Sequence, residues 1–167
     1  KGAARAFQKS RDTEAREYLN LIQGDVMVAA DVEAAVAGHD AVILTFGAPL
    51  NRDTVLHQPS LCETGTRHVV AALSRVRYGR LVCMTSLGAG DSAHHGRFVF
   101  RQLIAPLLLG HIMRDRTAQE KVVQNAALKD WVIVRPTELA DGAAAPVRII
   151  RDLAHEPEPT TITRQSV

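Results

Sequence analysis

The sequence predicts an α/β fold in which helices cover both faces of a doubly wound parallel sheet. Short runs of aliphatic and β-branched residues alternate along the chain with segments of helical character. The apolar runs are nearly continuous, which is typical of strands that are covered on both faces. Strands and helices in alternation favour parallel strands joined by right-handed crossovers. With 167 residues, 46% of them hydrophobic, we expect residues 1–167 to form one domain around one core.

The predicted strands are short. They are Leu19–Ile22, Ala41–Thr45, Leu81–Thr85 and Trp131–Val134. The first dozen residues have helical propensity but also stand where another strand is due, and we predict a strand there. Residues 147–150 are a candidate for a short late strand. Predicted loops are 142–146, which contains Gly, Ala and Pro, and 155–159, which contains two prolines.

The predicted helices lie between these strands. Residues Val28–Ala37 form the first one, and Gly38 follows where helices commonly close in a left-handed turn. The pattern Ser60-Leu61-Cys62-Glu63 predicts a capping box at the start of a helix that runs to about Val76. A longer helix is predicted over Ile112–Ala127, with Val122 and Val123 in its apolar stripe.

The charged residues favour no macromolecular partner. The net charge of +2 comes from 20 basic and 18 acidic residues that are interspersed along the chain, so we expect neither nucleic acid nor a membrane surface as a partner. No apolar run has the length of a membrane span, and no signal peptide opens the chain. We therefore expect a cytoplasmic protein whose partner is a small molecule.

Cysteine and histidine residues do not indicate a metal site. Cys62 and Cys83 lack CxxC or zinc-like spacing and are predicted to be buried thiols in a reducing compartment. His94 and His95 are interpreted as solvent-facing loop residues. We predict no metal.

Candidate binding residues follow the predicted strands, because ligands of a doubly wound sheet bind beyond the carboxyl ends of its strands. Asp25 can accept a hydrogen bond from an adenine amino group, or it can be a turn aspartate. Gly47 either lets the backbone approach a ligand closely or marks a turn. Ser86 has no adjacent histidine base, so it is interpreted as a hydrogen-bond donor, with a plain helix or turn cap as the alternative.

One glycine motif has the spacing of a phosphate-binding loop. Gly88-Ala89-Gly90-Asp91-Ser92-Ala93 satisfies the G-x-G-x-x-G/A pattern after a strand, but no second strand with a terminal acidic residue follows at the required distance. We predict that this motif does not bind pyrophosphate.

Several segments together resemble the atypical short-chain dehydrogenase/reductase group, and within it the biliverdin reductase B or flavin reductase-like, NmrA-like NAD(P)-binding family. The segments that carry the resemblance are Leu21–Val26, Ala29–Val32, Val36–Ile43, Glu63–Ala72, Cys83–Ser86 and Trp131–Pro136. The resemblance covers essentially the whole chain and implies a Rossmann-like fold.

Both ends of the domain are expected to be incomplete. The resemblance implies a preceding strand and a G-x-G/A-T-G-x-x-G loop before Lys1, so we expect the domain to be N-terminally truncated. At the other end, the chain stops at Val167 directly after Thr163-Arg164-Gln165-Ser166, a pattern that is typical of the start of a helix.

The resemblance further implies roles for individual residues. Lys9 would pair with the 2′-phosphate of NADP, which makes NADP the expected cofactor and NAD the less favoured one. Asp25 and Val26 would face adenine. Thr45, Phe46 and Gly47 would line the ribose and phosphates. Near the nicotinamide, the resemblance places Thr85, Ser86, Pro136 and Thr137, with Ser86 as the catalytic candidate that orients cofactor or substrate.

The sequence also departs from the group's pattern. Short-chain dehydrogenases typically use a Tyr-x-x-x-Lys pair, and Ile112 and Arg116 align with those two places here. Glu138 stands where biliverdin reductase B has a histidine. The resemblance therefore implies an NADPH-dependent reductase of a flavin-like or other small electrophilic acceptor. The alternative is a non-enzymatic NmrA-like NAD(P)-binding sensor that acts through a protein partner.

Overall fold

The computed structural model describes residues 19–76, 79–95, 109–156 and 161–167. Within them, a three-stranded sheet has the order β1 (Ala41–Leu44), β2 (Arg80–Met84), β3 (Trp131–Val134). Both strand pairs are parallel. The parallel α/β class predicted from the alternating pattern is confirmed, and β1, β2 and β3 begin within one residue of their predicted starts.

Three longer helices connect and cover these strands. They are α3 (Ala29–Val36), α5 (Leu61–Arg75) and α6 (Gly110–Gln124). They correspond to the predicted helices, and Gly38, with φ of 76°, ends the first of them in the left-handed conformation as expected. Two short elements were not predicted: α4 (Arg52–Leu56) and the 3-10 helix η1 (Gly90–His94).

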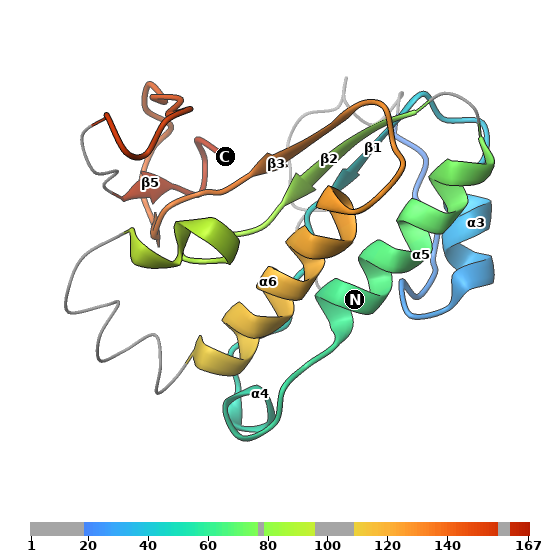
Figure 1. The fold of residues 1–167 in the computed structure, drawn as a ribbon, viewed down its shortest axis with the longest axis horizontal. Coiled ribbons are helices and arrows are strands. Elements are labelled where there is room, and N and C mark those ends of the chain that lie inside the picture. Colours follow the sequence, from blue (N-terminus) through green and yellow to red (C-terminus); the bar gives the residue numbers. More distant parts are fainter. Residues whose placement is uncertain (1–18, 77–78, 96–108, 157–160) are drawn as a thin grey trace.

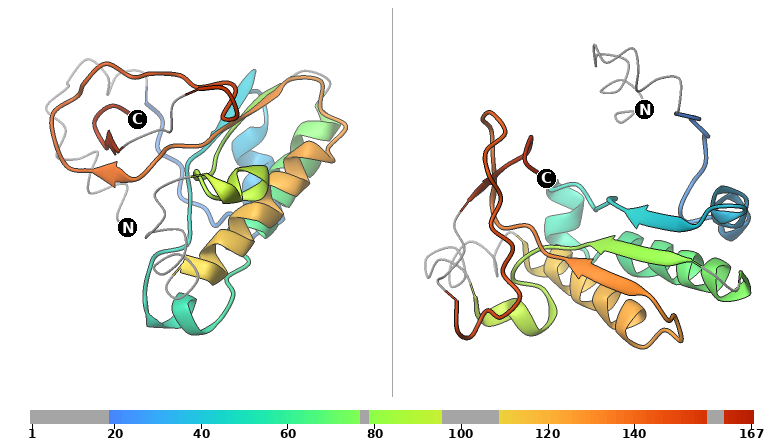
Figure 2. Two further views of the ribbon diagram at one scale, coloured as in Figure 1. Left: turned by 60° about the vertical axis from the view of Figure 1, so that its left-hand side comes forward. Right: turned by 90° about the horizontal axis from the view of Figure 1, so that it is seen from above.

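The long helices α5 and α6 pack on one face of the sheet. Figure 1 shows the sheet as an upper layer with α5 and α6 beneath it, and the right-hand view of Figure 2 shows the strands side by side in front of these helices. The covered face contributes Leu44, Leu81 and Cys83 to the core, where they meet Leu73 of α5 and Val123 of α6. Burial of this apolar face is the main force that holds helices and sheet together.

The opposite face of the sheet is apolar and largely exposed among the described residues. Ile43 is 65% exposed, Val132 45% and Val134 40%. These side chains alternate with the buried ones, because successive residues of a strand point to opposite faces. No helix of the described ranges packs on this face.

The predicted strand Leu19–Ile22 is absent. Residues 19–24 have no regular structure, and Leu21 and Ile22 are 64% and 63% exposed. A strand requires a hydrogen-bonded neighbour, and none of the described strands pairs with this segment, because β1 pairs only with β2. The strand predicted in the first dozen residues lies outside the described residues.

The C-terminal region contains a second sheet instead of the late strand considered for residues 147–150. Leu139–Ala140 (β4) pairs in parallel with Ile162–Thr163 (β5). Residues 147–150 are irregular, and Ile149 is 76% exposed. Three of its four residues are apolar, but none of the described strands pairs with it, so apolar composition alone does not produce a strand here.

The capping box predicted at Ser60 is also absent. Ser60 precedes α5, but its side chain makes no capping hydrogen bond. The carboxylate of Asp115 in α6 accepts hydrogen bonds from Cys62 N (2.9 Å) and Glu63 N (3.0 Å) instead. The Glu63 side chain pairs with Arg67. A buried carboxylate from a neighbouring helix thus satisfies the free N–H groups that the serine was expected to bind.

Both cysteines are buried free thiols, as predicted. None of the helices in the described ranges has the length and apolar character needed to cross a membrane.

Candidate functional site at the strand ends

The carboxyl ends of the three central strands bring most of the predicted binding residues to one edge of the sheet. Thr45, Phe46 and Gly47 follow β1, and Thr85 and Ser86 follow β2. Pro136 and Thr137 lie just beyond β3. The backbone stays paired past the strands, because Thr85 N donates to Val134 O (2.8 Å) and Leu87 N donates to Pro136 O (3.0 Å). This edge is where ligands bind in open parallel sheets.

Two hydroxyl groups at this edge have capacity for a ligand. Among the described residues, the Ser86 hydroxyl donates only to the carbonyl oxygen of its neighbour Leu87, at 3.2 Å. The Thr137 hydroxyl oxygen is buried and has no hydrogen-bond partner among the described residues. A buried hydroxyl without a partner carries a desolvation cost, which a bound polar group would remove.

Thr85 is built into the interior. Its hydroxyl donates to Oε1 of Glu120 at 2.7 Å, and both residues are buried. Glu120 also receives two hydrogen bonds from Arg135, from Nε at 2.9 Å and from Nη2 at 2.7 Å. Arg135 contacts Asp91 as well, and hydrogen bonding to Glu120 is the main cause that raises its pKa. The hydroxyl of Thr85 is therefore engaged in the protein interior, where it helps to hold the end of β2 in place.

Val26 and Phe46 meet over a glycine of α5. A Cβ atom at Gly65 would lie 2.7 Å from Cγ2 of Val26 and 2.9 Å from Cζ of Phe46. His68 Nδ1 donates to Val26 O at 3.0 Å and so holds this segment against the helix. The predicted adenine-facing and ribose-facing segments are thus adjacent, and only glycine allows them to pack this closely on α5.

Asp25 has the turn geometry that was the alternative interpretation. Its Oδ1 accepts a hydrogen bond from Met27 N (2.9 Å), and its own backbone N–H donates to Oδ2 of Asp31 (2.8 Å). The residue is exposed. This arrangement fixes the backbone between residue 25 and α3.

Arg116 was not among the predicted binding residues, but the structure places it at this edge. Its Nη1 donates to Met84 O at the end of β2 (3.0 Å) and to Oε1 of Gln119 (2.9 Å). Its Nη2 lies so near Gly47 that a Cβ at that position would clash with it. The signal that would have found Arg116 is its alignment with the lysine of the Tyr-x-x-x-Lys pair. Ile112, which aligns with the tyrosine, is 9% exposed and belongs to the buried hydrophobic residues.

The glycine motif at residues 88–93 is closed on itself. Gly88 N donates to the Ser92 hydroxyl (3.0 Å), and Gly90 N donates to the Thr117 hydroxyl (3.1 Å). A Cβ at Gly90 would clash with Glu120. The N–H groups of Gly88 and Gly90 are thus engaged within the protein.

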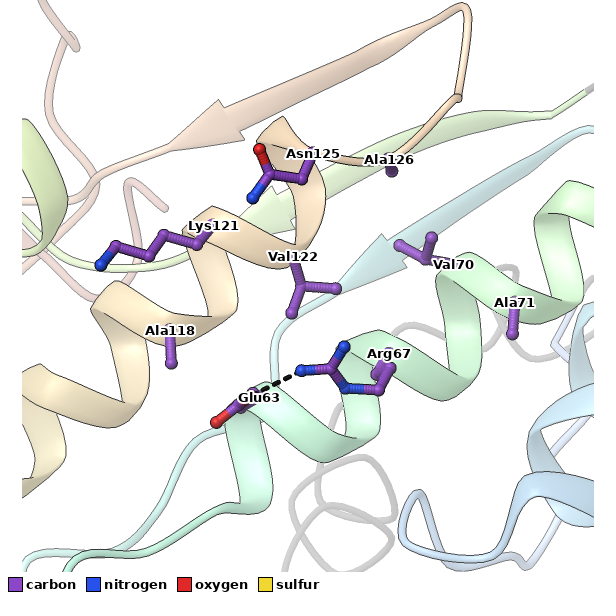
Figure 3. A pocket seen from close by; sticks show the side chains of 9 residues that line it. All are labelled: Glu63, Arg67, Val70, Ala71, Ala118, Lys121, Val122, Asn125 and Ala126. Atoms are coloured by element: carbon purple, nitrogen blue, oxygen red, sulfur yellow. Dashed lines mark hydrogen bonds and ion pairs between the residues drawn. The ribbon is translucent and has the colours of Figure 1, made fainter.

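A surface groove between α5 and α6 is separate from the strand ends. It is lined by the ion-paired residues Glu63 and Arg67, by Lys121 and Asn125, and by small apolar side chains (Figure 3). None of the predicted binding residues lines it. Lys9 lies outside the described residues.

A parallel sheet with polar groups gathered at its carboxyl edge defines a Rossmann-like nucleotide-binding domain. The chain belongs to a family of NAD(P)H-binding proteins, whose sequence pattern matches residues 1–167. This match confirms the NAD(P)-binding family that the sequence resemblance predicted.

Solved structures of this fold include two from Escherichia coli. ChuY from strain O157:H7, described as an anaerobillin reductase, has 29% sequence identity and a TM-score of 0.64, with 85% of this chain and 61% of ChuY covered. ChuY from strain CFT073 has 26% identity and a TM-score of 0.61, with 83% and 65% covered. A short-chain dehydrogenase/reductase from Veillonella parvula in complex with NADP has the same fold at 16% identity and a TM-score of 0.66, with 87% and 59% covered. The chain thus spans less than two thirds of each of these proteins.

Proposed function

We propose that this protein is an NADPH-dependent reductase that transfers hydride to a flavin-like or other small electrophilic acceptor at the carboxyl ends of β1, β2 and β3. The observation that carries the proposal is the pair of available hydroxyl groups at this edge, the partnerless Thr137 hydroxyl and the weakly bonded Ser86 hydroxyl. Both lie next to strands of a chain that belongs to an NAD(P)H-binding family. The description of ChuY as a reductase supports the reaction class.

The residues at the strand ends fit a reduced nicotinamide dinucleotide. NADPH, when bound, supplies the hydride. Ser86 and Thr137 donate hydrogen bonds that orient polar groups of the ring or the acceptor. Val26 and Phe46 provide an apolar surface beside Asp25 for the adenine end, and Gly47 keeps the end of β1 free of a side chain. The contribution of the protein is orientation of the two reactants.

The same site supports a second candidate function. Ile112 stands in place of the tyrosine and has no proton to give, so the Tyr-x-x-x-Lys type of proton relay is absent. Direct hydride transfer does not need that relay, but a sensor needs no chemistry at all. The alternative is therefore an NmrA-like NAD(P)-binding sensor that acts through a protein partner.

The test of the proposed function is NADPH oxidation followed at the nicotinamide absorbance in the presence of FMN, FAD, quinones or linear tetrapyrroles. We expect turnover with at least one acceptor and a lower kcat in Ser86→Ala. Absence of turnover with all four acceptor classes would refute the reductase proposal. Cofactor-dependent binding of a partner protein without turnover would favour the sensor.

Cofactor choice provides a separate prediction. If Lys9 pairs with the 2′-phosphate, Lys9→Glu weakens NADPH binding by about 10-fold or more and leaves NADH binding nearly unchanged, since a charge-assisted hydrogen bond is replaced by repulsion. Dissociation constants from fluorescence titration measure this. Lys129→Glu is the matched control, because it makes the same charge change just before β3, at the amino end of that strand. Equal weakening of both cofactors by Lys9→Glu would contradict the role of Lys9.

A further inference from the structure

The guanidinium of Arg116 has unused hydrogen-bonding capacity. Nη1 uses its two N–H groups on Met84 O and on Gln119. In the described part of the chain, neither Nε nor Nη2 donates a hydrogen bond, and no carboxylate lies within ion-pair distance of Arg116. Other arginines that lie near the interior are paired, as Arg135 is with Glu120 and Asp91.

The position of this cation is fixed by its surroundings. Gln119, which receives one of its hydrogen bonds, is fully buried and donates to the Thr66 hydroxyl (3.0 Å) in α5. Met84 O anchors the other hydrogen bond at the end of β2. The guanidinium is therefore held half-buried between two strand ends and two helices, and its free N–H groups lie on the side of Gly47.

Gly47 shows how the site makes room for this group. The backbone of Gly47 has no positive φ, so the conformation does not require glycine. The available space does require glycine, because a Cβ at this position would clash with Nη2 of Arg116. The positive charge of Arg116 also acts on the two buried thiols. It lowers the pKa of Cys62 and Cys83 and so opposes the effect of burial, which raises both.

We propose that Arg116 binds an oxyanion of the ligand at the strand ends, either a phosphate of the cofactor or an anionic group of the acceptor. This inference rests on the proposed function and adds a binding residue to it. A planar guanidinium with free N–H groups matches the oxygen atoms of phosphate and carboxylate groups. A half-buried cation without a counter-charge gains most from such a partner, because the lower local dielectric strengthens the attraction.

The experiment uses three ligands as probes: NADPH and FMN, which carry phosphate groups, and riboflavin, which does not. Dissociation constants of NADPH, FMN and riboflavin are measured for the wild-type protein and for Arg116→Met, Arg116→Lys and Arg114→Met. FMN and riboflavin share the ring system and differ in the phosphate. Arg114→Met is the matched control, because Arg114 lies exposed on the same helix, where it contacts His111.

If the oxyanion belongs to the cofactor, Arg116→Met weakens NADPH binding by about 10-fold or more, as expected for loss of a charge-assisted hydrogen bond. If it belongs to the acceptor, FMN binding weakens by about that factor while riboflavin and NADPH are unchanged. Arg116→Lys keeps the charge, so it retains part of the lost affinity, and this separates anion binding from a merely structural role. Gly47→Ala, which displaces the guanidinium, acts in the same direction.

Unchanged dissociation constants of NADPH and FMN in a folded Arg116→Met, or equal losses for FMN and riboflavin with NADPH binding unchanged, would overturn the inference. Should Arg116→Met fail to fold, Arg116→Gln, which also removes the charge, decides by the same criterion. Failure of the reductase proposal is distinguishable, because a protein without turnover can still show the effect of Arg116 on binding. Turnover with unaltered binding in Arg116→Met would leave the reductase proposal intact and refute the inference.

Discussion

At the scale of single residues, the two thiols show how burial controls reactivity. Burial raises the pKa of Cys62 from 9.0 to about 11 and that of Cys83 to about 12, with the negative charges of Asp115 and Glu120 adding to the effect. The thiolate is the reactive form, and neither side chain is accessible. Both cysteines are therefore structural.

These pKa values predict how stability depends on pH. The folded-state pKa lies above the unfolded value, so the contribution is complete below pH 9.0 and is lost as pH rises from there toward about 11 for Cys62 and about 12 for Cys83. Urea denaturation at pH 8 and pH 10 measures this, and the Cys62→Ala/Cys83→Ala variant should lose less stability over that interval. Alkylation of native wild-type protein by iodoacetamide at pH 8, as fast as in urea, would contradict the burial.

The glycines at positions 47 and 65 act through space rather than through backbone conformation. Neither has a positive φ, and each is in contact with side chains from another part of the chain. The sequence marks both as glycine but does not tell a turn from a close approach. Only the positions of Arg116, Val26 and Phe46 in the fold make that distinction.

At the scale of elements, α5 depends on α6 for its cap. The carboxylate of Asp115 binds the N–H groups of Cys62 and Glu63, and it is 1% exposed. A local serine would cap α5 independently of its neighbour. Because the cap is tertiary, formation of the first turn of α5 is coupled to the packing of α6.

This coupling gives a prediction with a built-in control. Asp115→Ala is expected to lower the free energy of unfolding by about 2 kcal/mol, since a cap is lost and buried N–H groups are left without partners. Ser60→Ala should have little effect, because the serine side chain makes no capping hydrogen bond. Chemical denaturation of both variants measures the difference. A larger loss of stability in Ser60→Ala than in Asp115→Ala would contradict the cap by Asp115 and favour the local capping box.

At the scale of the whole molecule, the Glu120–Arg135 pair joins elements that are far apart in sequence. Glu120 lies in α6, Arg135 follows β3, and the Thr85 hydroxyl that donates to Glu120 follows β2. Asp91 of η1 pairs with the same arginine. This network closes the helical layer onto the sheet directly behind the proposed site.

Breaking that network on one side only should be costly. Arg135→Met leaves the Glu120 carboxylate buried with the Thr85 hydroxyl as its remaining described partner, and we expect a loss of about 3–5 kcal/mol of stability. The double variant Arg135→Met/Glu120→Gln should lose less than the sum of the single losses, which a double-mutant cycle in urea measures. The exposed pair Arg80–Asp130 is the control, and its removal should change stability little. Strict additivity for Arg135 and Glu120 would contradict the coupling.

Local sequence patterns were sufficient for much of the fold. Continuous apolar runs at 41–45, 81–85 and 131–134 predicted the three parallel strands, because buried parallel strands need apolar side chains on both faces. The helices between them were predicted from helical propensity. The left-handed conformation of Gly38 was predicted because glycine commonly ends a helix in this way. The resemblance of several sequence segments to known relatives indicated the NAD(P)-binding family, which the comparison confirms.

The tertiary structure decided the rest, since it depends on partners that are distant in sequence. Residues 19–22 have strand composition but no described strand beside them, and Ser60 has a capping pattern whose N–H groups another helix already holds. Arg116 aligns with the lysine of the Tyr-x-x-x-Lys pair, but its place between the ends of β1 and β2 appears only when α6 packs under the sheet. By itself, the sequence determined the three central strands and the helices between them, because propensity and apolar patterning are local, and its motifs indicated the family by resemblance. Which side chains meet at the strand ends was decided only by the packing of those elements.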